Sequence, residues 1–555
     1  MPAQKFNAVN QSNSETASSA DVRNKFQEAW NRPQEAGNRT QWFEPYAEGF
    51  SEHQRQETTV LFGGLTTAQD LLLEGALKGL GYRVQHLAEA DLDSFRIGKE
   101  FGNRGQCNPA YFTAGNLIKY LEQLHQSSGV PRDEIVKRYV FLTIDACGPC
   151  RYGAYITEYR KALRDAGFPG FRVVVMHKQG VNVTMENPGI ALNAKFIVRI
   201  LRAVLVGDAL NAMGYRIRAY ETEQGATDRA LARCKEVLYD AFSEGKSVLL
   251  AARRCRKIFA GVKVDRSQVK PKVSVIGEFW ATTTEGDGNY HIQRFLEQEG
   301  AEVEAQPVAI WVLYTIWTSH DRYIHYSRVH RDAQPGAGAD RTDAGNSSAG
   351  RVRAARVWGK VRARAQSFVL NRLFSAAEWA VHAGFQTYAK ALGLNDYQLP
   401  DMDEMAQVAH EFYNSQLRGG EGHMEVAKVI LNTTKKKSTM TLSVKPFGCM
   451  PSSAVSDGIQ SLVVDRFPDA LFLPIETTGD GIVNVHSRVQ MILHKAKQRA
   501  YKEYETALAH TGLDKDAVEK LRSHPRLQDP LRYPKHQVAC TAANEIYGLK
   551  HPLSS

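Results

Sequence analysis

Long apolar runs, tandem repeats and a cysteine-rich framework are all missing from this sequence of 555 residues. No apolar stretch reaches the length that a membrane-spanning helix needs, and the first residues contain no apolar core of a secretory signal. Only seven cysteines are present, an odd number at wide spacing, which suits a reducing compartment better than a set of structural disulfides. We therefore expect a cytoplasmic protein with no membrane partner.

A strong charge of one sign is also missing. The formal net charge of +10 is moderate for this length, and much of it comes from two short segments, 351–364 and 435–437. A basic helix can bind nucleic acid or an anionic cofactor such as an acyl-CoA, but a solvated helix face is the commoner explanation. The sequence thus argues against a nucleic-acid partner and leaves the role of 351–364 open.

The residues that are present have the composition of an ordinary globular protein, with 43% hydrophobic and 23% charged residues. The length predicts more than one domain. One β-α-β pattern begins near residue 58 and a second begins at residue 273, and such units form parallel sheets with right-handed crossovers. We therefore predict an α/β fold of two Rossmann-like lobes with additional helices.

The predicted boundaries follow changes in composition along the chain. A polar extension without apolar periodicity comes first, a basic linker separates the lobes, a Gly/Ala/Asp/Ser-rich loop predicted to be disordered interrupts the second lobe, and a helical tail broken by prolines follows. The predicted segments are the extension (1–55), the first lobe (56–261), the linker (262–272), the second lobe (273–508) with its insertion (331–350), and the tail (509–555).

The segment Asp145–Tyr155 places two thiols between a predicted strand and a predicted helix. Cys147 and Cys150 lie in the sequence Cys-Gly-Pro-Cys, which by itself suggests a thioredoxin-type redox pair. The chain is much too long for one thioredoxin domain, however, and Cys107 and Cys449 also lie in turns flanked by glycine and proline. Turn cysteines of this kind are typical of metal or cluster ligands, whereas we interpret the other three cysteines as structural.

The order of these motifs resembles that of the 2-hydroxyacyl-CoA dehydratase (2-hydroxyglutaryl-CoA dehydratase-like) superfamily. The most similar branch is that of the iron–sulfur proteins related to acyl-CoA dehydratase activases. The resemblance extends over most of both predicted lobes. The segments that carry it are Gly105–Pro109, Gly148–Gly153, Arg218–Gly225, Gly420–Gly422 and Pro446–Pro451.

Three features depart from the family pattern. Ala219 stands where the family has a proline, and Asn108 stands where a small or apolar residue is more usual. The sequence also lacks the nucleotide-binding module of the actin type that larger relatives carry. Hydrolysis of ATP would therefore fall to a separate partner, the activase.

The resemblance implies a [4Fe–4S] cluster, or a double cluster, in the cleft between the two lobes. Its ligands would be Cys107, Cys150 and Cys449, with Cys147 as a candidate fourth ligand. The implied reaction is the radical dehydration of an acyl-CoA, or a related reduction, driven by low-potential electrons from the ATP-dependent activase. A second copy of the chain or a related subunit is a further expected partner.

Residues beside the cysteines are expected to tune such a cluster. Gly148 and Gly448 lie in turns whose N–H groups can donate to sulfur, and Arg104 and Arg151 can shift the reduction potential. These four residues are the predicted cofactor-binding positions.

Two glutamates are the candidates for proton chemistry. Glu421 lies in a Gly-Gly-Glu-Gly turn and is the predicted catalytic acid or base, although it can equally cap the next helix. Glu278 follows a predicted strand of the second lobe, the usual position of a ligand-side residue in an α/β fold. A structural role explains Glu278 equally well.

Other functions remain open at this point. A non-catalytic electron carrier or double-cluster reductase would use the same ligands. A zinc-stabilised binding protein would use the four turn cysteines as a Zn(Cys)4 site, but such sites usually take two close pairs, and Cys107 and Cys449 are unpaired. A dithiol redox role for Cys147 and Cys150 is the remaining alternative.

Overall fold

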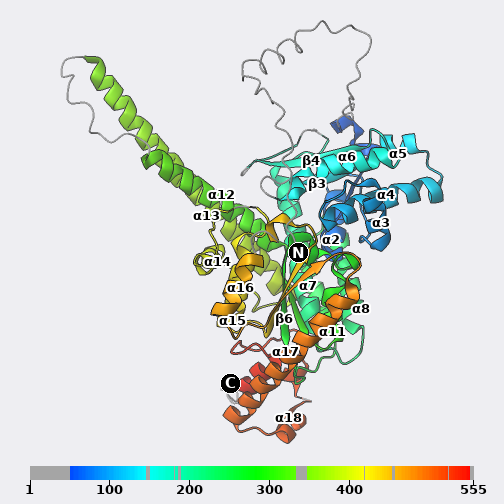
Figure 1. The fold of residues 1–555 in the computed structure, drawn as a ribbon, viewed down its shortest axis with the longest axis vertical. Helices are drawn as coiled ribbons and strands as arrows, with labels where there is room; N and C mark the ends of the chain where they lie inside the picture. The colour runs from blue at the N-terminus through cyan, green and yellow to red at the C-terminus, as the bar shows by residue number, and fades with distance from the viewer. Residues whose placement is uncertain are drawn as a thin grey trace, which may run out of the picture. The chain divides into compact units, whose positions relative to one another are not determined.

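The computed structural model describes residues 50–144, 150–179, 182–185, 189–332, 347–417, 419–452, 457–522 and 524–549 (Figure 1). Two mainly parallel sheets lie among many helices, which confirms the predicted α/β class. No helix in the described ranges is long and apolar enough to cross a membrane.

The first sheet contains five strands in the order β2-β1-β3-β4-β5. Four of them are parallel, and β5 pairs antiparallel with β4. The four parallel strands were predicted, since each is a short apolar run rich in β-branched residues. The bounds of β1 to β5 are Thr59–Phe62, Val84–His86, Tyr139–Ile144, Arg172–Gln179 and Asn182–Met185.

Helices pack on both faces of this sheet and continue beyond it. Thr66 caps α2 as predicted, because its side chain accepts a hydrogen bond from the N–H of Gln69. The helices of this part are α2 (Thr67–Lys78), α3 (Leu92–Phe101), α4 (Asn108–Ser128), α5 (Arg132–Arg138), η2 (Arg151–Ala154), α6 (Tyr155–Asp165) and α7 (Ala194–Arg218).

The apolar periodicity before Phe259 predicts one long helix, and this prediction is wrong. The segment forms two helices, α8 (Ala226–Ser243) and α9 (Val248–Phe259), which pack on one another. The chain turns at Gly245, whose φ of +71° is easy only for glycine. Cys234 and Cys255 face each other across the two helices in the apolar core, in agreement with their structural interpretation.

The second sheet contains four parallel strands in the order β7-β6-β8-β9. In chain order β6 to β9 are Lys272–Gly277, Glu302–Ala305, Met440–Pro446 and Phe472–Thr477. The helices that accompany it are α10 (Phe279–Thr283), η3 (Asp287–Asn289), α11 (Ile292–Gln298), α14 (Met402–Ala409), α15 (His423–Thr434), α16 (Asp457–Arg466) and α17 (Ile482–Thr511).

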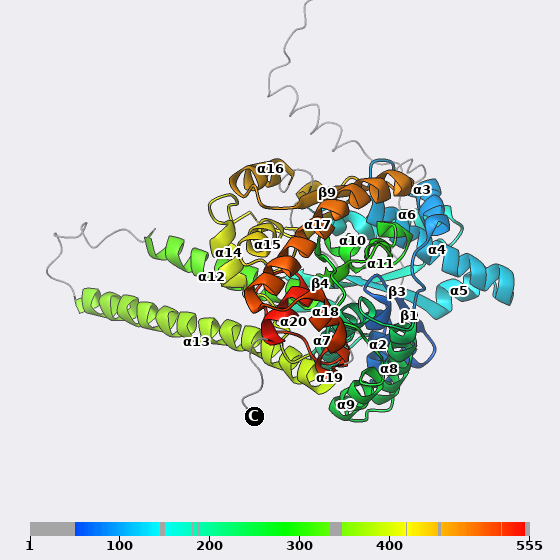
Figure 2. The same ribbon diagram turned by 90° about the horizontal axis from the view of Figure 1, so that it is seen from below.

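The predicted disordered insertion at 331–350 lies between two long helices. Helix α12 (Ala309–Asp332) extends into it from one side and α13 (Ser347–Leu392) begins within it, so the ends of this range are helical, while 333–346 fall outside the described residues. Figures 1 and 2 both show the two helices running side by side away from the sheets. The ring of His320 stacks on Phe374, with centroids 5.0 Å apart.

The described ends of the chain pack onto the fold. Phe50, which we placed in a flexible extension, is 1% exposed and lies beside η1 (Glu52–Gln56), so residues 50–55 belong to the folded part. The C-terminal tail forms α18 (Lys515–Leu521), α19 (Pro525–Gln528) and α20 (Thr541–Leu549). Helix α20 packs on α17 around a small apolar core.

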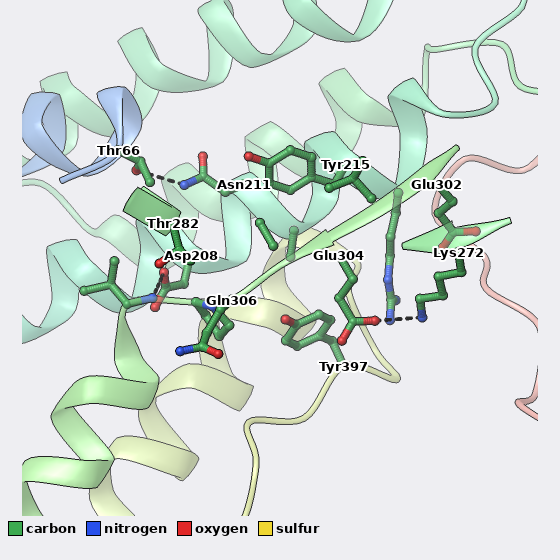
Figure 3. A pocket seen from close by; sticks show the side chains of 16 residues that line it. Thr66, Asp208, Asn211, Tyr215, Lys272, Thr282, Glu302, Glu304, Gln306 and Tyr397 are labelled. Atoms are coloured by element: carbon green, nitrogen blue, oxygen red, sulfur yellow. Dashed lines mark hydrogen bonds and ion pairs between the residues drawn. The ribbon is translucent and has the colours of Figure 1, made fainter. Parts of the chain in front are cut away.

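A buried polar network links the helices of the first half to the second sheet (Figure 3). Asp208 on α7 accepts hydrogen bonds from the N–H groups of Val308 (2.8 Å) and Ala309 (2.7 Å) at the start of α12. Gln69 of α2 donates to the same carboxylate at 2.8 Å. Burial raises the pKa of Asp208 to about 7. The small cavity of about 30 Å³ beside this network has room for about one water molecule.

Candidate metal centre

The three described turn cysteines lie at the carboxyl ends of strands or the N-termini of helices. Cys107 is the N-cap of α4, Cys150 precedes η2 on the segment that follows β3, and Cys449 follows β8. The carboxyl ends of parallel strands are the usual place for ligands in open α/β sheets. Each of these predicted ligand turns therefore lies at a position where α/β folds commonly bind ligands.

The turns of Cys107 and Cys449 are in direct contact, although they belong to different halves of the chain. The N–H of Asn108 donates to the carbonyl of Phe447 at 3.1 Å, and the Asn108 side chain donates to the carbonyl of Thr477 at 2.6 Å. A Cβ atom added to Gly448 would lie only 3.1 Å from the Cα of Cys107. Glycine at 448, with φ of +79°, is what permits this approach.

Cys150 shares charged neighbours with the other two thiols. Burial, with the charges of Glu278, Glu421 and Cys107 adding to its effect, raises the pKa of Cys150 to about 12. Burial followed by the charge of Glu278 also raises the pKa of Cys449. Glu278 acts in the same direction on Cys107. The charge of Glu278 therefore acts on all three thiols.

Glu278 and Glu421 are held in place by the second sheet and its helices. Glu278 follows β6 and caps α10, since its side chain accepts from the N–H of Ala281 at 2.9 Å. Glu421 is 5% exposed, and its Oε1 accepts from the N–H of Phe279 at 2.9 Å. The carboxyl of Glu421 thus bonds the residue that follows Glu278, which brings the two acids to one place.

These acids hold their protons more firmly than ordinary carboxyls. Burial raises the pKa of Glu278 to about 7, and the charge of Glu425 adds to this. Burial, followed by the charges of Glu278 and Glu425, raises the pKa of Glu421 well above its ordinary value. Glu425 itself accepts hydrogen bonds from Ser443 and Gln460. The centre therefore combines thiols with carboxyls that can be protonated near neutral pH.

Polar groups next to the sulfurs were missed by the sequence analysis. The hydroxyl of Tyr155 lies 2.8 Å from the Sγ of Cys107, and the Sγ of Cys449 donates to the hydroxyl of Ser452 at 3.4 Å. Burial and the neighbouring Cys107 raise the pKa of Tyr155, so that its phenol stays protonated. The sequence signal that could have identified Tyr155 as a neighbour of the thiols was its position in the motif that follows Cys150.

The other predicted positions divide into three groups. Arg151 lies at the centre: its guanidinium donates to the carbonyl of Gly105 and lowers the pKa of Cys107 against the effect of burial. Arg104 is exposed, and nothing in the described structure ties it to the thiols. Cys147 and Gly148 lie outside the described residues.

The donor set of the centre consists of thiols, which iron–sulfur clusters and zinc ions both take as ligands. Among the described residues, no three His, Cys, Asp or Glu side chains are arranged to hold one metal ion. A single zinc ion, with Zn–S bonds of about 2.3 Å, needs its sulfurs close together, whereas a [4Fe–4S] cluster binds each thiolate through a different iron. Buried thiols with raised pKa values become thiolates when a cationic group binds them. Cys107, Cys150 and Cys449 fit a cluster on this chemistry.

Comparison with known proteins adds no assignment to the chain. A scan against models of protein families and a search of curated protein sequences each find no match. The resemblance to the dehydratase superfamily therefore rests on the sequence motifs alone.

Proposed function

We propose that this chain is an iron–sulfur protein in which Cys107, Cys150 and Cys449 hold a [4Fe–4S] cluster. Low-potential electrons from a separate ATP-dependent activase would serve the dehydration of an acyl-CoA, or a related reduction. The observation that carries the proposal is the contact between the turns of buried Cys107 and Cys449, together with the charge of Glu278, which acts on both of these thiols and on half-buried Cys150. When bound through three thiolates, the cluster would supply electron transfer and an iron with an open position.

The residues around the thiols have separable roles in this proposal. Tyr155 and Ser452 provide hydroxyl groups to the sulfurs of Cys107 and Cys449, and such bonds adjust reduction potential. Arg151 adds positive charge near Cys107. Together these contacts favour the thiolate forms that ligation requires.

The buried acids favour an enzyme over a simple electron carrier. Loss of a hydroxyl group from a substrate requires a proton, and a positioned acid with a raised pKa can provide it near neutral pH. Oε1 of Glu421 accepts the N–H of Phe279, so the proton of this carboxyl belongs on Oε2. Glu421 is thus assigned as the proton donor, because burial, followed by the charges of Glu278 and Glu425, raises the pKa of its carboxyl well above the ordinary value. A carrier of electrons alone would need these acids only for the structural bonds that they make to Ala281 and Phe279.

The first test is metal content. Anaerobically purified wild type should contain about four irons and matching sulfide per chain, with a dithionite-dependent EPR signal, whereas eight irons would indicate a double cluster. Cys150→Ser and Cys449→Ser should lose this iron. Cys234→Ser is the matched control, because its buried thiol lies in the core between α8 and α9, and it should keep the iron. Stoichiometric zinc without sulfide would contradict the proposal.

The second test separates catalysis from electron transport. Glu421→Gln should keep the iron and its EPR signal but lose turnover of a 2-hydroxyacyl-CoA thioester in the presence of an activase and ATP. A carrier would accept electrons from the activase equally well in wild type and variant and would turn over no thioester. That second result would make the chain an electron carrier.

A further inference from the structure

A second cavity, of about 180 Å³, lies at the carboxyl ends of the strands of the first sheet. The segments after β1 and β2 line it, together with β3, α2, α4 and Trp280 of α10, and no described cysteine is among its lining residues. The chain runs from β1 to β2 on one side and then crosses to β3 on the other side of β1. Open α/β sheets bind their ligands at this reversal of strand order.

The turn between β1 and α2 exposes backbone to this cavity. It contains Gly63 and Gly64, and Gly64 has a φ of +109° that other residues rarely adopt. Gly64 lies next to Trp280, since an added Cβ would be in ordinary van der Waals contact, at 4.0 Å, with the Cδ1 atom of that ring. In nucleotide-binding α/β folds, glycines in the first βα turn let a ligand approach the backbone in this way.

The place that a phosphate takes in such folds is already filled by the protein. Phosphates bind the free N–H groups at the start of the helix after β1. Here the carboxylate of Glu285 accepts from the N–H (3.0 Å) and the hydroxyl (2.6 Å) of Thr67. Asp70 accepts from the N–H groups of Gly64 (3.0 Å) and Leu65 (3.4 Å). The N–H groups of this turn are therefore already bonded, and the carboxylates that bond them are negatively charged. Both features exclude a phosphate group from this position.

What the cavity offers instead is a hydrogen-bond acceptor and apolar ring surfaces. Glu89 lies three residues beyond β2, where an acidic residue binds ribose hydroxyls in dinucleotide-binding folds. One of its oxygens is held by the N–H of Glu285 and by the hydroxyl of Thr284. Trp280 and Phe141 also line the cavity, although these residues are only 7% and 4% exposed because Trp280 packs on Phe112 and Phe141 packs on Tyr159.

We propose that this cavity binds a nucleoside that carries no phosphate group, with its ribose hydroxyls donating to Glu89 and its base lying against Trp280. A cavity of about 150 Å³ is large enough for benzene, so the present one encloses one ring of a nucleoside. The proposal concerns a different site from the thiols and does not depend on the cluster. Its ligand would be recognised by hydroxyl donors and a flat ring, not by negative charge.

The test is calorimetric titration of the full chain with adenosine, uridine and AMP. At least one nucleoside should bind, and AMP should bind at least about tenfold more weakly than adenosine, because the carboxylates of Asp70 and Glu285 repel its phosphate. Glu89→Gln should weaken nucleoside binding about threefold or more, the usual effect of losing one hydrogen-bond acceptor. Glu236→Gln, an exposed glutamate on α8, is the matched control and should bind like wild type.

A second variant guards against a misfolded Glu89→Gln protein. Ala88 is exposed and lines the cavity, so Ala88→Phe should fill the site without disturbing the core and should abolish binding. The proposal is overturned if neither nucleoside binds, if AMP binds more tightly than adenosine, or if folded Glu89→Gln and Ala88→Phe bind as wild type does.

Discussion

At the scale of single residues, one glycine sets how closely the two halves of the proposed metal centre approach. Gly448 combines a positive φ with a backbone-to-backbone approach, because the Cα of Cys107 lies 3.1 Å from where a Cβ would be. Any side chain at this position would have to push the Cys107 turn away. The spacing of the two thiols is therefore sensitive to the size of a residue that is not a ligand.

We expect Gly448→Ala to lower both stability and iron content. The left-handed backbone conformation alone should cost about 1–2 kcal/mol, and the close contact should add to this. Gly512→Ala is the matched control, since Gly512 has a φ of +72° with open space around it. Thermal unfolding and iron analysis of both variants check the prediction. Equal loss of stability, with normal iron in both variants, would show that the close contact is unimportant.

The sequence was sufficient to single out three turn cysteines as candidate ligands, which stays a prediction, but not to describe their surroundings. Cys107, Cys150 and Cys449 were recognisable because glycine and proline flank them, which is a local signal. The proximity of Glu278 to all three thiols depends on which turns meet in space, and no local pattern reports that. Tyr155 is a similar case, because a tyrosine in the first turn of a helix is usually part of the apolar core.

At the scale of elements, α7 fixes the start of α12. Asp208 lies within α7, yet it accepts the N–H groups of Val308 and Ala309, which helix geometry leaves without partners inside α12. A buried carboxylate at a helix N-terminus is favourable for the helix, but its burial raises the pKa of Asp208 to about 7. The contact is therefore sensitive to pH.

We expect Asp208→Asn to become more stable relative to wild type as the pH rises from about 4 to 7. In this interval the carboxyl of unfolded wild type loses its proton while the folded one keeps it, which lowers wild-type stability by roughly 1.4 kcal/mol per pH unit. Above about pH 8 the difference should stay constant. Unfolding midpoints between pH 4 and 9 provide the check, with the exposed Asp469→Asn as control. A pH-independent difference would contradict the raised pKa.

The elements themselves were predictable where local signals agree. Strand β3, Tyr139–Ile144, was predicted at its observed bounds because it is an apolar, β-branched run. Strand β5, Asn182–Met185, was missed because four residues carry too little pattern. The break between α8 and α9 was missed because good helix formers surround Gly245, and only the packing of the two helices shows the turn.

At the scale of the whole molecule, the proposed centre adds a connection between two parts of the chain that already share a large apolar core and the Asp208 network. The hydrogen bonds of Asn108 to Phe447 and Thr477 attach the first half to the second half at this point. A group bound by Cys107, Cys150 and Cys449 would strengthen this connection. A ligand that binds only the folded chain stabilises it by mass action.

We therefore expect removal of the metal with an oxidant and a chelator to lower the unfolding temperature of wild type by at least a few degrees. The same treatment should leave the midpoint of Cys150→Ser unchanged, because this variant has no metal to lose. Calorimetry of treated and untreated samples is the measurement. Identical midpoints for treated and untreated wild type would show that the metal does not hold the two halves together.

The contact between the turns of Cys107 and Cys449 also determines when the centre can form during biosynthesis. Cys449 follows Cys150 by about 300 residues, so a ribosome that adds about 5–20 residues per second produces it about 15–60 seconds later. During that time the nascent chain displays thiols without the partner turn that completes the centre. Loading of the proposed cluster would therefore be a late event of maturation, and a chaperone that shields Cys107 and Cys150 until Cys449 emerges would protect them from premature oxidation.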